Sequence, residues 1–436
     1  MNSAESAALE MVLCERGWKK SSNGGKPDLV LLNTCSVRQT AETRLKGRLA
    51  QYEALKKKYS LSDKRNGNRP FTLVVAGCMA SRLGEGLKAA YPAIDYVMGT
   101  ASRSIFPDIL KAVETGKSYE ADGEPAVFSF SSSHLEEGAF RSFVPIMHGC
   151  DNFCSYCVVP YVRGREVCRS PRSVAEEIAL LAERGVREIT LLGQNVNSYR
   201  YEDENGTVDF PGLLRMVAAW TRGSSIAWIR FLSANPKDLS GETIAVMAEN
   251  ACFCRHIHLP VQHGSDSVLA AMNRRYTRKS FFQLVEDLRK AMPSLSLSTD
   301  ILVGFPGETE EDLEAVLDLM EQVRFLYSYM YHYNPREGTA AFDLPGRIPE
   351  KTKRERLSRV IALQKKHTAE ALEKRLGRQE MVLIEGISRK NADELIGRTE
   401  RDEMAVFPGT REKIGSFAGV TLHSLKGHTF RAEQVN

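Results

Sequence analysis

The sequence has 436 residues, a hydrophobic fraction of 42% and a formal net charge of +4. This length exceeds the size at which a single core stops growing, so we expect two or three domains. The sequence has neither an uncharged apolar run that could cross a bilayer nor a signal-peptide pattern at its start, which argues against a membrane protein and predicts a cytoplasmic one. The mild positive charge permits a nucleic-acid partner without requiring one. In a reducing compartment the nine cysteines favour metal binding over disulfides.

Two cysteines occupy matching positions in the N-terminal part of the sequence. Apolar runs at residues 29–32, 72–76 and 96–98 predict three strands of a small α/β domain with an open parallel sheet. Cys35 and Cys78 follow two of these strands closely, at the end where open α/β sheets place their ligand sites. A lone cysteine is more often a small buried hydrophobic residue, but the matched pair favours a shared metal site.

A C-x-x-x-C-x-x-C run follows a short apolar segment at residues 143–147. Its cysteines, Cys150, Cys154 and Cys157, can bind three corners of one metal centre, which in a four-iron cubane leaves one iron open to a small molecule. A structural zinc site is the alternative, but zinc usually takes four closed ligands, and Cys168 is the only further cysteine nearby. The spacing is the signature of radical S-adenosylmethionine (SAM) proteins and predicts a [4Fe-4S] cluster.

Alternating strand and helix patterns after residue 138 predict a parallel sheet, open or closed into a partial barrel. Ser173 and Glu176 have the spacing of a capping box, which predicts a helix that begins there and ends at Gly185. Thr309 is predicted to cap a later helix with an acidic first turn. The predicted strands of this part span residues 188–192, 229–232, 257–261, 295–303 and 326–333.

Polar residues and glycines at the predicted strand ends are candidates for holding a nucleotide-like ligand. We expect four of them to hold the methionine and ribose of SAM, although each could instead cap a helix or fill a turn. These four are Gln194, Ser233, Asp300 and Gly304. Arg163 and Arg165, directly after the cysteine run, could bind RNA phosphate or the SAM carboxylate, or remain solvated, because arginine suits bidentate contacts.

Short β-like runs follow a charged helical stretch at residues 351–376 and predict a small β-barrel. Small barrels often bind oligonucleotides, but basic and acidic residues nearly balance in this one, so charge leaves RNA binding open. The predicted parts are the N-terminal domain at residues 1–120, a linker rich in Ser, Glu and Gly at 121–137, the central domain at 138–370 and the barrel at 371–436.

Several motifs, in order along nearly the whole sequence, resemble the methylthiotransferases, a radical-SAM family. The cysteine run extended through residue 165 is similar to that family, as are residues 33–38 and 77–80. Residues 192–199 resemble its tRNA-modifying MiaB branch, and residues 333–339 resemble its Ser-Pro-Arg-x-Gly-Thr signature with Asn in place of Ser. The C-terminal β region resembles the TRAM domain that these enzymes use for RNA.

The resemblance implies a reaction at C2 of an N6-isopentenylated adenosine beside the tRNA anticodon, where a C–H bond becomes C–S–CH3. An aromatic C–H bond resists acid–base attack, so a radical route is physically reasonable and no general base is named. The family pattern implies one [4Fe-4S] cluster on Cys150, Cys154 and Cys157, where SAM is cleaved, and a second on Cys35 and Cys78 that presents sulfur. It also implies tRNA, an electron donor protein and a sulfur donor protein as partners, no membrane and a monomeric enzyme.

The sequence departs from the family pattern at its N-terminus. The family opens with a strand that ends in Gly-Cys-Gln-Met-Asn, and residues 1–6 here resemble what directly follows that cysteine. The third ligand of the second cluster and its strand are therefore missing, either because the start was assigned too late or because the second site is incomplete. Cys14 lies in a predicted helix and is expected to be a core residue rather than a replacement ligand.

Three other functions compete with tRNA methylthiolation. A methylthiotransferase acting on a ribosomal protein would use the same chemistry, but residues 192–199 argue against it. An RNA-binding protein with a structural metal would not need the open-iron spacing. A radical-SAM protein that cleaves SAM but cannot insert sulfur would follow if the third ligand is truly absent.

Overall fold

The computed structural model describes residues 2–21, 27–36, 39–63, 71–100, 102–117, 119, 130, 138–204 and 206–435. It contains two compact units. The first comprises Met1–Leu135, His148–Phe153 and Cys157–Glu166, and the second comprises Glu136–Met147, Cys154–Tyr156 and Val167–Asn436. The predicted linker at residues 121–137 lies outside the described residues except for Phe130.

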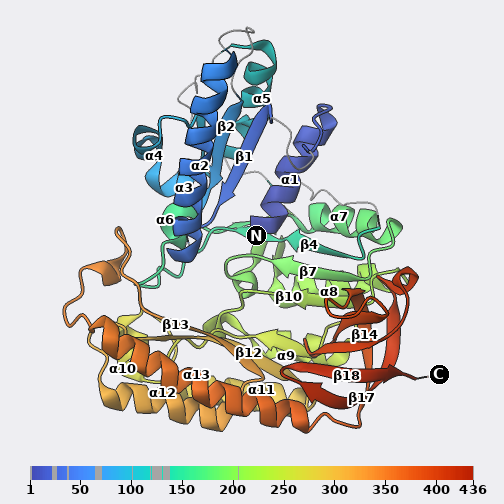
Figure 1. Ribbon diagram of the computed structural model, residues 1–436. Coiled ribbons are helices and arrows are strands. Elements are labelled where there is room, and N and C mark those ends of the chain that lie inside the picture. Colours follow the sequence, from blue (N-terminus) through green and yellow to red (C-terminus); the bar gives the residue numbers. More distant parts are fainter. Residues whose placement is uncertain are drawn as a thin grey trace. The chain divides into compact units, whose positions relative to one another are not determined.

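The first unit is a three-stranded parallel sheet with helices on both faces (Figure 1). Side chains alternate across a strand, so Leu73 and Val75 of the central strand pack with Leu49 on one face, whereas Val74 and Ala76 pack on the other. The sheet comprises β1 (Leu29–Thr34), β2 (Thr72–Gly77) and β3 (Tyr96–Met98), and the helices are α1 (Asn2–Glu15), α2 (Gln39–Asp63), α3 (Cys78–Leu83), α4 (Glu85–Ala90), η1 (Ser102–Ile105), α5 (Phe106–Thr115) and α6 (Val159–Arg163). The predicted parallel-sheet fold is confirmed.

The second unit is built on six parallel strands in two three-stranded groups, β10-β7-β4 and β11-β12-β13. A parallel bridge between Ile229 and Phe253 joins the first group to the chain just before the second. The strands are β4 (Arg141–Pro145), β7 (Glu188–Leu192), β10 (Trp228–Phe231), β11 (His256–His258), β12 (Ser296–Val303) and β13 (Tyr327–His332). Two short strands, β5 (Met147–His148) and β6 (Val167–Cys168), precede and follow the cysteine run along the chain.

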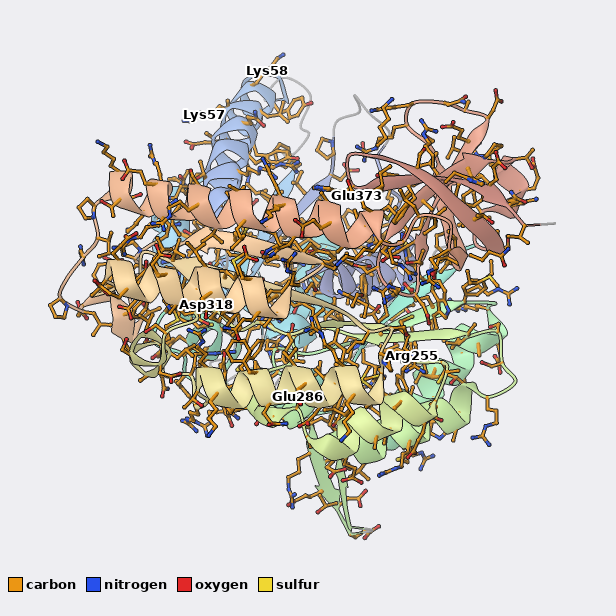
Figure 2. The ribbon with its side chains drawn as sticks, turned by 90° about the horizontal axis from the view of Figure 1, so that it is seen from below. Lys57, Lys58, Arg255, Glu286, Asp318 and Glu373 are labelled. Atoms are coloured by element: carbon orange, nitrogen blue, oxygen red, sulfur yellow. The ribbon has the colours of Figure 1, made fainter. Side chains whose placement is uncertain are left out.

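Helices alternate with these strands, as βα repeats require. They are α7 (Pro171–Glu183), α8 (Phe210–Thr221), α9 (Gly241–Glu249), α10 (Asp266–Ala271), α11 (Arg278–Ala291), α12 (Glu310–Val323) and α13 (Glu350–Glu373). Figure 2 shows α11, α12 and α13 side by side, with Glu286, Asp318 and Glu373 on them in turn. An ion pair between Arg278 and Asp318 links the first two of these helices.

Of the two predicted helix starts, one is confirmed and one is wrong. Thr309 caps α12 and exchanges hydrogen bonds with Asp312, as predicted. The predicted start at Ser173 is wrong, because Ser170 is the N-cap of α7 and Pro171 occupies its first position. Proline is favoured at that position because its missing N–H has no partner to lose.

The antiparallel hairpin of β8 (Arg200–Asp203) and β9 (Gly206–Asp209) was not predicted.

The C-terminal strands close into a barrel in the order β14-β15-β16-β18-β17, drawn in red in Figure 1. They are β14 (Gln379–Ile387), β15 (Glu394–Thr399), β16 (Met404–Pro408), β17 (Phe417–Lys426) and β18 (Thr429–Gln434). Inward-facing Val382, Leu395, Phe407, Val420 and Phe430 fill the barrel, each less than 2% exposed. The predicted small β-barrel is confirmed.

Arg230 of β10 attaches this barrel to the parallel strands. Its guanidinium pairs with Glu188 of β7 at 2.8 Å and donates to the backbone carbonyls of Thr399 and Glu400 at 2.9 and 3.0 Å. Both charged side chains are buried.

In the described ranges, none of the helices has the length and apolar composition that a membrane crossing requires.

The substitution Glu188→Ala should lower the free energy of unfolding of the second unit by about 3–5 kcal/mol, because it leaves the Arg230 charge buried without its carboxylate. Glu202→Ala is the matched control, since Glu202 pairs with Arg200 at the surface; the expected change is below about 0.5 kcal/mol. Urea denaturation followed by circular dichroism measures both. Equal losses in the two variants would contradict the assigned role of Arg230.

Candidate functional site

The loop that contains the cysteine run closes tightly on the residues that follow it. Gly149 has a φ of +78°, and a Cβ at this position would overlap the backbone carbonyl of Arg165. The backbone N–H of Cys150 donates to the carbonyl of Gly164 at 3.2 Å. Phe153 has a φ of +47°, which is uncommon for a residue with a side chain. The loop is therefore held in one conformation by its own backbone.

The central part of the run is fixed by Ser155. Its backbone N–H donates to the carbonyl of Met272 at 3.0 Å, and its hydroxyl donates to the carbonyl of Ala271 at 2.8 Å. Its own carbonyl accepts a hydrogen bond from the N–H of Ala341 at 2.7 Å. The neighbouring Cys154 is thus anchored to the end of α10.

Each of the three sulfur atoms accepts a hydrogen bond from nitrogen. Asn152 Nδ2 lies 3.5 Å from Cys150 Sγ, Arg274 Nη1 lies 3.3 Å from Cys154 Sγ, and the N–H of Val159 lies 3.5 Å from Cys157 Sγ. Such donors stabilise negative charge on sulfur that is shielded from water. The donor set fits three thiolates bound to an iron–sulfur cluster, whose charged sulfurs need the same support.

The described part of the chain does not gather three His, Cys, Asp or Glu side chains closely enough to hold one metal ion. In a cubane each thiolate binds a different iron, so the three sulfurs do not converge on one atom. A structural zinc ion needs four ligands that do converge on it.

Arg274 contacts the cysteine run, which the sequence did not reveal. Besides Cys154, its guanidinium contacts the carbonyl of Pro260 at 3.0 Å and the hydroxyl of Tyr276 at 2.9 Å. Burial alone lowers the pKa of Arg274, but Tyr156, Tyr276 and Cys154 raise it, and the net shift is well upward. The guanidinium therefore remains charged beside the sulfur. Only the fold brings it to a cysteine 120 residues earlier in the chain.

Two of the four predicted SAM contacts lie at the ends of neighbouring strands. Gln194 follows β7, and both polar atoms of its amide are buried without a hydrogen-bond partner among the described residues. Ser233 follows β10 with a φ of +69°, and its carbonyl accepts from the N–H of Val196 at 3.3 Å. This bond joins the two loops. A buried amide without a partner is costly, so Gln194 is suited to a polar ligand.

The other two predicted contacts belong to β12. Asp300 lies inside this strand, three residues before its last residue, and not at its end as predicted; its carboxylate is 3.5 Å from His258 Nε2. Gly304 follows the strand with a φ of +72°, and a Cβ there would lie 2.5 Å from the side chain of Lys353. Close packing against Lys353 is by itself a sufficient reason for glycine at this position.

Cys35 and Cys78 lie side by side in the first unit. The parallel register of β1 and β2 ends with Thr34 opposite Gly77, so the two cysteines directly follow the ends of adjacent strands, Cys78 as the first residue of α3. The hydroxyl of Thr34 donates to the carbonyl of Ala76 at 2.6 Å and accepts from the N–H of Met79 at 3.2 Å. Two adjacent thiols at a sheet end fit a shared metal centre.

Arg163, at the end of α6, approaches this pair of cysteines. It forms a bidentate ion pair with Glu5 of α1, with nitrogen–oxygen distances of 2.5 and 3.2 Å, and its positive charge acts on Cys78. Burial raises the pKa of the Cys78 thiol, and the Arg163 charge opposes this shift. Because its partner is Glu5 and both side chains are buried, Arg163 is not available for RNA phosphate.

The remaining cysteines occupy varied environments. Cys14, expected in the core, is exposed on α1, because the apolar face of that helix lies elsewhere around its axis. Cys168 accepts a hydrogen bond from the N–H of Arg200 at 3.3 Å. Cys254 is buried, and this burial raises the pKa of its thiol.

Models of three protein families match the chain. The model of the radical SAM superfamily matches residues 144–320, that of the uncharacterized protein family UPF0004 matches residues 1–99, and that of the TRAM domain matches residues 373–435. The first match contains the cysteine run and the last contains the closed barrel.

Two solved structures show a similar fold at low sequence identity. The radical SAM methyltransferase TsrM from Kitasatospora setae, with cobalamin and a [4Fe-4S] cluster bound, is 17% identical with a TM-score of 0.57, over 78% of this chain and 74% of that one. The cobalamin-dependent SAM radical enzyme OxsB, with aqua-cobalamin and SAM bound, is 13% identical with a TM-score of 0.52, over 84% and 54% of the two chains.

Curated relatives align over the whole chain. A tRNA-2-methylthio-N(6)-dimethylallyladenosine synthase of Treponema pallidum (strain Nichols) is 48% identical over 100% of this chain and 96% of that protein. Enzymes with the same name from Syntrophus aciditrophicus and Porphyromonas gingivalis are 40% and 39% identical, over 100% of this chain and 94% and 93% of theirs. The chain belongs to the radical SAM family of tRNA-2-methylthio-N(6)-dimethylallyladenosine synthases.

Proposed function

We propose that this protein converts the C2–H bond of N6-dimethylallyladenosine in tRNA into C–S–CH3. The observation that supports this most strongly is the cysteine run itself, in a chain that is 38–48% identical over nearly its full length to several synthases of that name. Each of its sulfurs has a nitrogen donor, as bound thiolates need.

Cys150, Cys154 and Cys157 would hold a [4Fe-4S] cluster with SAM at its open iron. When bound, this group supplies the electron that cleaves SAM and starts radical chemistry at an unreactive aromatic C–H bond. Asn152 and Arg274 keep the sulfurs hydrogen-bonded and fixed in position. The buried amide of Gln194 would bind polar groups of SAM, with Ser233 on the adjoining loop.

A second [4Fe-4S] cluster would use Cys35 and Cys78 with a third ligand, and would present the sulfur that is inserted. The support is that these cysteines directly follow the paired ends of two adjacent strands. The partners that complete this proposal are tRNA bound by the TRAM barrel, an electron donor protein and a sulfur donor protein. We propose that the enzyme works as a monomer in the cytoplasm.

Methylthiolation of a ribosomal protein is less well supported, because the curated relatives reported above are all named for tRNA. SAM cleavage without sulfur insertion is the alternative if Cys35 and Cys78 do not complete a cluster. These alternatives differ in product and in iron content, so two measurements separate them.

Expression of the protein in cells that lack this modification should produce 2-methylthio-N6-dimethylallyladenosine in their tRNA. Cys154→Ala should abolish it, because one cluster ligand and its bond to Arg274 are lost. Mass spectrometry of tRNA nucleosides measures both outcomes. Unchanged tRNA together with a modified ribosomal protein would overturn the proposal.

Anaerobic reconstitution should give about four irons per chain on the cysteine run, and about four more if Cys35 and Cys78 have a third ligand. The Cys150→Ala/Cys154→Ala/Cys157→Ala variant should lose the first four, and the Cys35→Ala/Cys78→Ala variant should lose the second four. Cys252→Ala is the control and should keep the wild-type value, because Cys252 belongs to neither set. Colorimetric iron and sulfide assays measure this. About four irons in the wild type would favour SAM cleavage without sulfur insertion.

Gly149→Ala should remove about four irons per chain, because the added Cβ would overlap the Arg165 carbonyl and open the loop. Gly164→Ala is a matched control, since it has a similar positive φ of +75° but nothing within 4 Å of an added Cβ. The control should keep its iron and lose only about 1–3 kcal/mol of stability, because its φ of +75° and ψ of −166° disfavour a side chain. Equal iron loss in both variants would show that backbone strain, and not the overlap, is responsible.

A further inference from the structure

Arg274 is a partly buried arginine whose hydrogen-bond partners, in the described part of the chain, do not include a carboxylate. Its guanidinium donates to the sulfur of Cys154 at 3.3 Å, the hydroxyl of Tyr276 at 2.9 Å, the carbonyl of Pro260 at 3.0 Å and the amide oxygen of Asn235 at 3.4 Å. A charge shielded from water is costly unless an opposite charge lies close to it. Of these partners, the cysteine is the one that can be an anion, as a thiolate bound to iron is.

The ion pair of Arg230 shows how the fold balances a guanidinium elsewhere in the same unit. Arg230 pairs with Glu188 at 2.8 Å, and both side chains are buried. At Arg274 the sulfur of Cys154 takes the position that the carboxylate oxygen holds in that pair. We therefore expect the negative charge that balances Arg274 to lie on this sulfur.

The end of α10 brings the guanidinium and the sulfur together. The N–H of Ser155, the residue after Cys154, donates to the carbonyl of Met272 at 3.0 Å. Asn273 then has a φ of +55°, a left-handed conformation that asparagine adopts more readily than most residues at the end of a helix. The chain turns at this point and places Arg274 beside the sulfur.

Tyr276 orients the guanidinium. Its hydroxyl accepts from Arg274 Nε at 2.9 Å and donates to the carbonyl of Val261 at 2.8 Å. The central carbon of the guanidinium lies 5.1 Å from the centre of the tyrosine ring, within the range of a cation–π contact. These contacts fix the plane of the group, with Nη1 at the sulfur of Cys154. A lysine could supply the charge but not this geometry, because its ammonium is a point charge.

We propose that Arg274 is a positioning residue for the iron–sulfur cluster on the cysteine run, and that its positive charge raises the reduction potential of this cluster. The inference rests on the proposed function, in that it requires a cluster on Cys150, Cys154 and Cys157. One-electron reduction, by the electron donor protein or by dithionite in vitro, adds a negative charge to the cluster. A guanidinium at hydrogen-bond distance from one ligand stabilises the reduced form more than the oxidised form.

Arg274→Gln should lower the reduction potential, because it removes the charge and keeps a side chain that can donate a hydrogen bond. The equilibrium for reduction should change by about tenfold or more, which corresponds to about 59 mV for one electron. Arg274→Lys keeps the charge and should lower the potential less. A role in packing alone would give similar potentials in the two variants.

The measurement is a redox titration with dithionite in the absence of SAM, followed by electron paramagnetic resonance, on the full chain with Cys35 and Cys78 changed to Ala. In this background the cluster on the cysteine run takes up the electron. Arg275→Gln is the matched control, because it removes the same charge from the next residue, which is exposed to water and therefore screened. This control should have the potential of the background protein.

An unchanged potential in Arg274→Gln would overturn the proposal, as would equal potentials in Arg274→Lys and Arg274→Gln. An unchanged potential together with weaker binding of SAM, measured by equilibrium dialysis, would show that Arg274 acts on SAM instead. If Arg274→Gln retains no iron, Tyr276→Phe decides, because it keeps the charge but removes the hydroxyl that orients it. Its potential should fall, and an unchanged value would overturn the proposal.

Two results separate this inference from the proposed function. A lowered potential in Arg274→Gln, together with a wild type that leaves tRNA unmodified, would support the inference and refute the function. An unchanged potential together with methylthiolated tRNA would refute the inference alone. A background protein without iron on the cysteine run would overturn both.

Discussion

Negative charge on sulfur, held away from water, is the constraint on which the site depends. A thiolate in a buried position is unstable unless donors face it, and this chain places a nitrogen donor at each of three sulfurs. One donor is a side chain within the loop, one is the backbone, and one is an arginine from a distant segment. The tight turn at Gly149 and the anchoring of Ser155 both serve to hold these sulfurs where the donors are.

Hydrophobic patterns predicted the regular elements well, because burial alone determines them. The run at residues 188–192 became β7 with those bounds, and all five of its residues are buried. The N-cap of α7 was predicted three residues late, because a capping pattern at Ser173 competes with a better one at Ser170. The β8–β9 hairpin was missed because its strands are short, polar and mostly exposed.

The candidate site was predictable only in part. Cysteine spacing is a local property, so Cys150, Cys154 and Cys157 could be named from sequence. The contacts of Arg274 with Cys154 and of Arg163 with Glu5 join residues 120 or more positions apart, which a local pattern does not show. The position of Arg163 after the cysteine run suggested RNA phosphate or SAM as its partner, and not Glu5. For Gly304 the ligand contact stays a prediction, since the structure shows only that a Cβ at this position would lie 2.5 Å from the side chain of Lys353.

The attachment of the C-terminal barrel uses main-chain acceptors. Arg230 donates to the carbonyls of Thr399 and Glu400, and every amino acid supplies such a carbonyl. The attachment therefore depends on the shape of the turn between β15 and β16 and not on the side chain of Glu400. Thr399 maintains that shape, since its hydroxyl accepts from the N–H groups of Arg401 and Glu403.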